Sequence, residues 1–133
     1  MDYGSLVLLI VIHIIFDFVL QSRTIATNKS SSIKYLIPHL VILFVGLTIF
    51  IHFSGRYTYN QATVFLFGNV ILHGIIDWNI WNLYKFLVIK RFPKADASYK
   101  YYEDKVFYDF IALDQGLHAL CYLGLDYLAR TYV

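Results

Sequence analysis

The chain of 133 residues has little charge, since only 15% of its residues are Asp, Glu, Lys or Arg, against about 25% in soluble domains. Its one cysteine excludes an intramolecular disulfide and any cysteine-rich metal site. A net charge of +2 without a clustered basic helix argues against nucleic acid as a partner. The length is sufficient for one domain and too short for two of ordinary size.

Apolar residues, in contrast, make up 59% of the chain and gather in four runs close to bilayer length. We therefore predict an all-α, polytopic membrane protein in which four transmembrane helices form one bundle. The predicted helices cover about residues 5–21, 35–53, 62–87 and 106–128 of a single integral membrane domain, 1–133. The first run lacks a preceding positive charge and a following cleavage site, so we expect it to be retained as a helix.

The distribution of basic residues predicts the orientation of the bundle. Of the 11 Lys and Arg, three lie in the connection 22–34 and six in the stretch 85–105, whereas Arg56 and Arg130 fall on the other side. Basic connections favour the cytoplasm. We therefore expect four crossings, with both of these connections in the cytoplasm and both termini outside it.

Three of the apolar runs contain a histidine and an aspartate four residues apart. The pairs are His13 with Asp17, His73 with Asp77 and, in reversed order, Asp114 with His118. Four residues make about one helical turn, so both members of a pair leave the same helix face. The reversed pair lies on the helix expected to run in the opposite direction, so the aspartates share one depth and the histidines lie roughly 6 Å deeper. His39, in the second run, is expected near the aspartate layer.

These pairs predict a shared metal site inside the bundle. An unpaired Asp near the bilayer centre costs about 2.5–3.5 kcal/mol on insertion scales, so the carboxylates should face inward and share a positive partner. A divalent cation meets this need, and mixed His and Asp ligands favour Zn, with Mn or Fe as alternatives. The predicted ligands are His13, Asp17, His39, His73, Asp77, Asp114 and His118. They exceed one tetrahedral site, which leaves open two metals or an outer set of orienting residues.

Other polar residues suggest how such a site is used. Gln21 extends the face of His13 and Asp17, Asn69 extends that of His73, and both are expected to orient ligands or substrate through hydrogen bonds. Four basic residues near the cytoplasmic mouth are suited to dock an anionic headgroup: Arg23, Lys29, Lys34 and Lys85. Metal-activated water beside them predicts a hydrolase of lipid-like or phosphoester substrates, with catalytic residues Asp17, Asp77 and Asp114.

Two other functions use the same residues. A proton or metal-ion carrier would pass its cargo along the His/Asp layer, although four short helices in a monomer leave little room for alternating access. A non-enzymatic phage membrane protein acting on host machinery would need the pairs only as interhelical hydrogen bonds. The lipid bilayer is the expected partner in each case, and association into a homo-oligomer is left open.

The polar pattern resembles domain-of-unknown-function family 3307 (DUF3307), small multi-helix membrane proteins of bacteria and their phages. The motifs that carry it are His13-x3-Asp17-Phe18-x2-Gln21, then Lys29, His39, His73-x3-Asp77 and Asp114-Gln115-x2-His118. The resemblance implies that the membrane is the bacterial inner membrane, with Gln115 among the cofactor-binding residues, and that the site consists of His13, Asp17, Gln21, His39, His73, Asp77, Asp114, Gln115 and His118. Family members tend to place a Lys soon after the third-run Asp, whereas here Trp78 to Asn82 come before Lys85. A distant similarity to predicted membrane-bound metal-dependent hydrolases points to the same chemistry by analogy.

Overall fold

The computed structural model describes residues 2–91 and 104–133, which form helices and no strand. The elements are α1 (Tyr3–Ile14), the π-helix η1 (Ile15–Val19), α2 (Arg23–Asn28), α3 (Ile33–Ser54), α4 (Tyr59–Arg91) and α5 (Lys105–Tyr132). The all-α prediction is therefore confirmed. The four predicted ranges correspond to α1 with η1, α3, α4 and α5. The basic residues between 92 and 103 lie outside the described residues.

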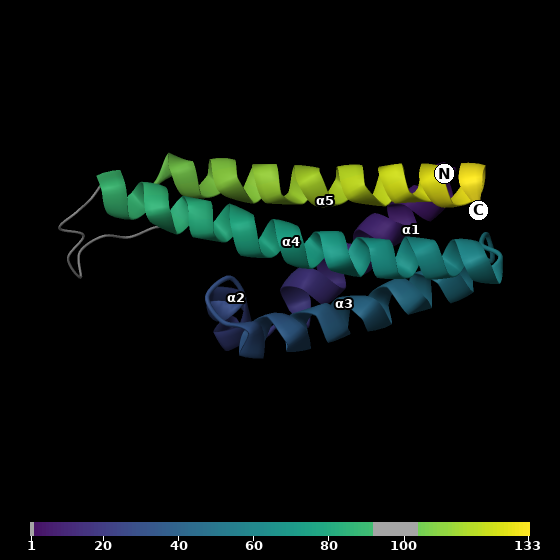
Figure 1. Ribbon diagram of the computed structural model, residues 1–133, viewed down its shortest axis with the longest axis horizontal. Helices are drawn as coiled ribbons and strands as arrows, with labels where there is room; N and C mark the ends of the chain where they lie inside the picture. Colours follow the sequence, from purple (N-terminus) through teal and green to yellow (C-terminus); the bar gives the residue numbers. More distant parts are fainter. Residues whose placement is uncertain (1, 92–103) are drawn as a thin grey trace.

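The long helices run side by side, and both termini lie at the same end of the molecule (Figure 1). α1 packs on α3, α3 on α4, and α4 on α5. At the opposite end, next to α2, α4 and α5 extend beyond the other helices (Figure 1). This up-and-down order brings the His/Asp pairs of separate segments to one level of the bundle.

α2 is a short helix within the stretch that the sequence indicated as a polar connection. Ser22 begins it as an N-cap, since its hydroxyl accepts a hydrogen bond from the Ile25 backbone N–H at 3.3 Å. α2 packs against α3 and ends at the C-cap Lys29. The connection therefore turns back toward the bundle, which decides where the Lys29 side chain goes.

Two helices, α3 and α4, are long and apolar enough to cross a membrane, and Tyr3–Val19 forms a shorter apolar helix. Many large apolar side chains lie exposed on the outer faces of the helices, among them Val7, Val41, Val45, Ile71 and Leu120. This pattern is compatible with a lipid environment. It supports the coarser part of the membrane prediction, namely two helices suited to span a bilayer.

The apolar core occupies the half of the bundle next to the termini. It is built from Leu9, Leu47, Phe50 and Phe65 with their neighbours. A Cβ on Gly46 would lie 2.7 Å from the ring of Phe16, so glycine at this position lets the Phe16 ring pack directly on α3. The predicted polar site adjoins this core, and a smaller aromatic group with Tyr84 and Phe110 is also buried between α4 and α5.

Candidate metal centre

The seven side chains that the sequence predicts as ligands are all buried, with at most 6% of each residue exposed. They are His13 from α1, Asp17 from η1, His39 from α3, His73 and Asp77 from α4, and Asp114 and His118 from α5. No pair turns outward. The structure therefore brings together residues that lie up to about a hundred positions apart in the chain, as the matched spacing required.

Four atoms from these residues converge most closely. The Nε2 atoms of His39 and His73 lie 2.8 Å apart, and Asp77 Oδ2 lies 2.8 Å from the first and 3.2 Å from the second. Asp17 Oδ1 completes the set at 3.3 Å from His39 Nε2 and 3.8 Å from His73 Nε2. Ligand atoms around one tetrahedral zinc, at bonds of 2.0–2.1 Å, lie roughly 3.3 Å apart. Five of the six separations among these four atoms are therefore close to the spacing within a single coordination sphere.

His118 and Asp114 adjoin this set from α5. The His118 ring stacks on the His73 ring, with centroids 3.9 Å apart, and its Nδ1 lies 3.8 Å from Asp114 Oδ2. Among the described residues, neither ring nitrogen of His118 has a hydrogen-bond partner. A buried imidazole without partners has lost its hydrogen bonds to water and gained none in the protein, which is unfavourable. His118 is therefore suited to bind a metal ion or a substrate.

The rings of His13, His73 and His118 form one group, because His13 lies 5.7 Å from His73 and 5.4 Å from His118 between centroids. His39 contacts Asp77 directly at 2.8 Å, which places it with the carboxylates. His39 also lies 2.8 Å from His73 Nε2 and so contacts both sets, and the division into two layers of different depth stays a prediction.

Lys29 is the feature of the centre that the sequence interpretation placed wrongly. It was assigned to a rim for headgroups, but it is 6% exposed, because α2 turns its C-terminal end back into the bundle. Its Nζ lies 3.0 Å from Asp77 Oδ1, 3.3 Å from Asp17 Oδ1 and 3.3 Å from His39 Nε2. Lys29 therefore forms ion pairs with both carboxylates and donates a hydrogen bond to Asp17 Oδ1.

The segment that carries Lys29 is tied to α4. Lys85 Nζ donates to Ser30 Oγ at 2.7 Å and also to Ser31 Oγ.

Burial lowers the pKa of the Lys29 ammonium, but Asp77 and Asp17 together raise it more, so that its pKa lies above the ordinary value. The two carboxylates thus favour the charged form of Lys29.

The buried acidic side chains of the centre favour the binding of a further cation. Three carboxylates, from Asp17, Asp77 and Asp114, face one ammonium, from Lys29, which leaves two negative charges if the imidazoles are neutral. Excess charge buried away from water is strongly unfavourable. One divalent ion would neutralise it, and three overlapping groups of these His and Asp residues have ligand atoms within 4.8 Å of one another.

Gln115 joins the carboxylates to His13. Its amide nitrogen lies 3.1 Å from Asp114 Oδ2 and 3.4 Å from Asp17 Oδ2. Because ionised carboxylates only accept hydrogen bonds, the amide oxygen must face His13 Nε2, at 3.0 Å. His13 then donates from Nε2 and accepts at Nδ1 from the Tyr122 hydroxyl, at 2.9 Å. In this arrangement His13 positions Gln115 and offers the centre no lone pair.

The comparison with protein families agrees with the resemblance drawn from the motifs. Residues 5–130 match the family described as "Protein of unknown function (DUF3307)". The chain belongs to the DUF3307 family. No curated protein and no solved structure matches it. The family description assigns no activity, so the function of this DUF3307 protein has to be argued from the centre itself.

The remaining predicted residues of this DUF3307 protein contact backbone. Gln21 donates to the Asp17 carbonyl and Asn69 to the Phe65 carbonyl, both at 2.7 Å. Each keeps a buried side-chain oxygen that has no hydrogen-bond partner in the described part of the chain. Gln21 thereby holds the end of η1, the element that presents Asp17. Direct orientation of a ligand or substrate by Gln21 or Asn69 stays a prediction.

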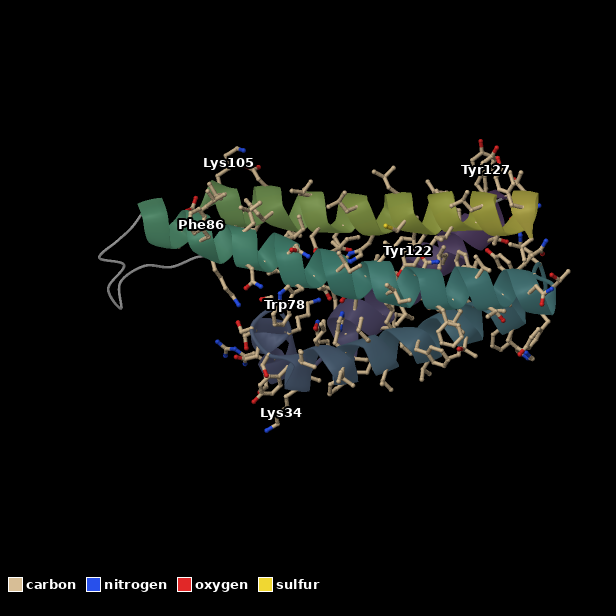
Figure 2. All side chains as sticks on the ribbon, viewed as in Figure 1. Lys34, Trp78, Phe86, Lys105, Tyr122 and Tyr127 are labelled. Carbon is tan, nitrogen blue, oxygen red and sulfur yellow. The ribbon has the colours of Figure 1, made fainter. Side chains whose placement is uncertain are left out.

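Tyr122 was not predicted, although the sequence contained the signal. It follows His118 by four residues, the spacing of the pairs themselves, and so shares their face of α5. Figure 2 shows it on the side of α5 that faces the other helices. In the DUF3307 centre it fixes which nitrogen of His13 carries the proton.

Proposed function

We propose that this protein is a membrane-embedded, metal-dependent hydrolase that acts on a lipid-like phosphoester at the cytoplasmic side of the bacterial inner membrane. The proposal rests on the convergence of two imidazoles with two carboxylates: Asp17 and Asp77 each place an oxygen 2.8–3.8 Å from the Nε2 atoms of His39 and His73, which lie 2.8 Å apart. Two imidazoles and two carboxylates favour Zn, with Mn or Fe as alternatives.

The membrane part of the proposal rests on the helices. With α3 and α4 long and apolar enough to span a bilayer, α1 with η1 and α5 would complete four crossings. α2 lies toward the end of the bundle remote from the termini (Figure 1), and Lys29 is its C-cap. Basic connections favour the cytoplasm, which would place the entrance to the centre on that side and both termini outside.

The residues around the centre have the chemical roles that hydrolysis needs. A bound divalent ion supplies positive charge and activates water. Lys29 adds a fixed positive charge beside the phosphoryl oxygens, where negative charge develops. Asp114 accepts the proton of the attacking water, whose oxygen forms the new P–O bond as the ester P–O bond breaks. His118, whose Nδ1 lies 3.8 Å from Asp114 Oδ2, takes up that proton at Nδ1 and gives its Nε2 proton to the departing alcohol, so that the imidazole stays neutral.

The proposal is tested by metal content and hydrolysis together. Wild-type protein, purified in mild detergent, is expected to contain about one divalent ion per chain and to release phosphate from a long-chain alkyl phosphate. Asp77→Asn should lose both properties. Asp109→Asn is the matched control, because Asp109 lies on the exposed surface of α5 in an ion pair with Lys105. A wild-type protein that binds no metal from a buffered Zn, Mn or Fe solution would contradict the proposal.

A carrier of protons or metal ions is the second candidate. The observation that favours it is a chain of close polar contacts, from Lys29 Nζ to His39 Nε2 at 3.3 Å and on to His73 Nε2 at 2.8 Å. Ion flux into proteoliposomes that is abolished by Asp114→Asn, without hydrolysis of alkyl phosphates, would support this function. Tolerance of a joint Lys29→Met and Asp77→Leu replacement would instead favour a purely structural role for the cluster.

A further inference from the structure

A groove of about 460 Å³ lies between α1 and α5 and leads to the edge of the polar centre. Most of its wall is apolar, formed by Leu6, Leu9, Ile10, Ile14, Phe18, Ala119 and Leu123. Its remaining lining residues are His13, Gln115 and Tyr122, all joined by hydrogen bonds within the centre. The volume is in the range of about 300–1,000 Å³ that small-molecule sites occupy.

The groove is the open side of the bundle. The backbones of α1 and α5 approach each other less closely than those of α1 and α3, α3 and α4, or α4 and α5. Its outer margin consists of exposed apolar side chains, including Ile10, Ile14, Phe18 and Leu123. An occupant could therefore enter sideways from an apolar surrounding without crossing a polar surface.

The shape and polarity of the groove indicate an elongated occupant. Its wall on α1 and η1 extends from Leu6 to Phe18, roughly 18 Å. His13 and Gln115 are nearer the Phe18 end, whereas the Leu6 end is lined by apolar side chains and by Tyr122, whose hydroxyl is hydrogen-bonded to His13. A molecule with a hydrocarbon chain and one polar end matches this distribution.

We infer that the groove between α1 and α5 holds one hydrocarbon chain of a lipid, with the polar end of that lipid directed past Gln115 toward the carboxylates. The inference rests on the proposed function for the chemistry of the polar end, but not for the binding of the chain. Gln115 is the boundary residue, because its amide contacts His13 on one side and Asp114 and Asp17 on the other. A phosphate oxygen could accept the hydrogen bond that the Gln115 oxygen now accepts from His13.

A second hollow, of about 370 Å³ between α3 and α4, provides an internal comparison. It is lined mainly by apolar residues, among them Leu36, Leu40, Ile71 and Ile75. None of the seven His and Asp residues of the centre lines it. An annular lipid would contact both hollows alike, whereas a substrate chain should prefer the groove that reaches the centre.

The test uses hexadecyl phosphate that carries a photoactivatable diazirine at the chain end, added to the full-length protein in mild detergent. Crosslinks should concentrate on the groove residues nearest the termini, such as Leu6, Leu9 and Leu123. Unlabelled hexadecyl phosphate should compete, and inorganic phosphate should not. Ala119→Trp, which fills the groove, should reduce crosslinking at least about tenfold, and Ile10→Trp on the opposite wall should do the same. Ile75→Trp, the matched control in the second hollow, should leave it unchanged.

The metal content of each variant separates this inference from the proposed function. Equal labelling of both hollows in a protein that binds its metal, or full labelling of the groove in folded Ala119→Trp and Ile10→Trp, would overturn the inference alone. Labelling confined to the groove in a protein that binds no metal would uphold chain binding and overturn the hydrolase. Circular dichroism identifies a variant that fails to fold.

Discussion

Asp77 and Asp126 are both buried aspartates in this bundle, with 0% and 4% of the residue exposed, but their surroundings differ. Asp77 contacts an ammonium and two imidazoles, from Lys29, His39 and His73, at 2.8–3.2 Å. Asp126, near the termini, accepts a hydrogen bond from the Tyr57 hydroxyl at 2.7 Å, and Arg130 lies 4.0 Å away.

The comparison shows what separates a structural polar pair from a candidate reactive centre. The Tyr57 ring stacks on Phe65, with centroids 4.9 Å apart, within the apolar core. Its hydroxyl links the α3–α4 connection to α5, which explains why a carboxylate is tolerated there. Around Asp77, in contrast, several groups with lone pairs face a common point, and imidazoles can exchange a proton for a metal ion. The first arrangement fastens helices together, and the second can bind.

The largest difference between the two aspartates should appear in metal binding. Asp77→Asn should lower metal affinity by at least about 100-fold, since even residues that only support ligands contribute about 10–100-fold. Asp126→Asn should leave affinity unchanged. Equilibrium dialysis against buffered zinc measures both. An equal loss of metal affinity in the two variants would show that affinity falls because the bundle is destabilised, and not because a metal ligand is removed.

Removal of the internal cation should strongly destabilise the fold. Lys29→Met leaves the carboxylates of Asp17 and Asp77 without their ammonium, and such a loss typically costs about 3–5 kcal/mol. Chemical unfolding in mixed micelles measures the change in the free energy of unfolding. Added zinc should restore part of the loss, because a divalent ion replaces the missing charge.

Lys34→Met is the matched control for that experiment, because Lys34 points away from the bundle (Figure 2). Its free energy of unfolding should differ little from that of the wild type. A Lys29→Met variant as stable as Lys34→Met would mean that the ammonium does not hold the carboxylates together.

The structural pair should give a smaller effect that is confined to stability. Tyr57→Phe removes the hydroxyl that donates a hydrogen bond to Asp126. The free energy of unfolding should fall by about 1–3 kcal/mol, and the metal content should stay unchanged. Tyr59→Phe is the control, since Tyr59 is exposed. Loss of metal in Tyr57→Phe would show that the two regions are coupled.

The smallest effect is a dependence on alkaline pH. Burial raises the pKa of Tyr57 above its ordinary value, and the hydrogen bond to Asp126 raises it further. The folded state therefore keeps this proton after the unfolded state has lost it. The contribution to stability is complete below the unfolded pKa and falls as pH rises above about 10. Unfolding measured from pH 9 to 11 should show a steeper loss of stability in wild type than in Tyr57→Phe, and equal slopes would contradict this assignment.

The seven His and Asp residues could be found from the sequence because their spacing is a local property. A His and an Asp four residues apart must share a helix face, whatever the rest of the chain does. The reversed order of Asp114 and His118 then predicted that this pair lies at the same depth as the other two, because its helix is expected to run in the opposite direction. The family could be identified from the same motifs, and the match over residues 5–130 confirms it.

Lys29 and η1 could not be found in this way, because each depends on tertiary structure. The position of Lys29 follows from the way α2 folds back on α3, and a stretch of Ser, Thr and Asn does not encode that direction. The π-helical turn at Ile15–Val19, which presents Asp17, has no sequence signature, although such turns are frequent at functional sites. Sequence periodicity thus identified the acids and imidazoles, but not the cation between them.

X-ray absorption at the zinc edge, on protein loaded with one equivalent of zinc, tests the central claim most directly. The account predicts nitrogen and oxygen ligands at about 2.0–2.1 Å, with the outer scattering of two imidazoles, reduced to one in His39→Gln. A spectrum of oxygen ligands alone, identical in wild type and His39→Gln, would contradict the claim that this cluster is a metal centre.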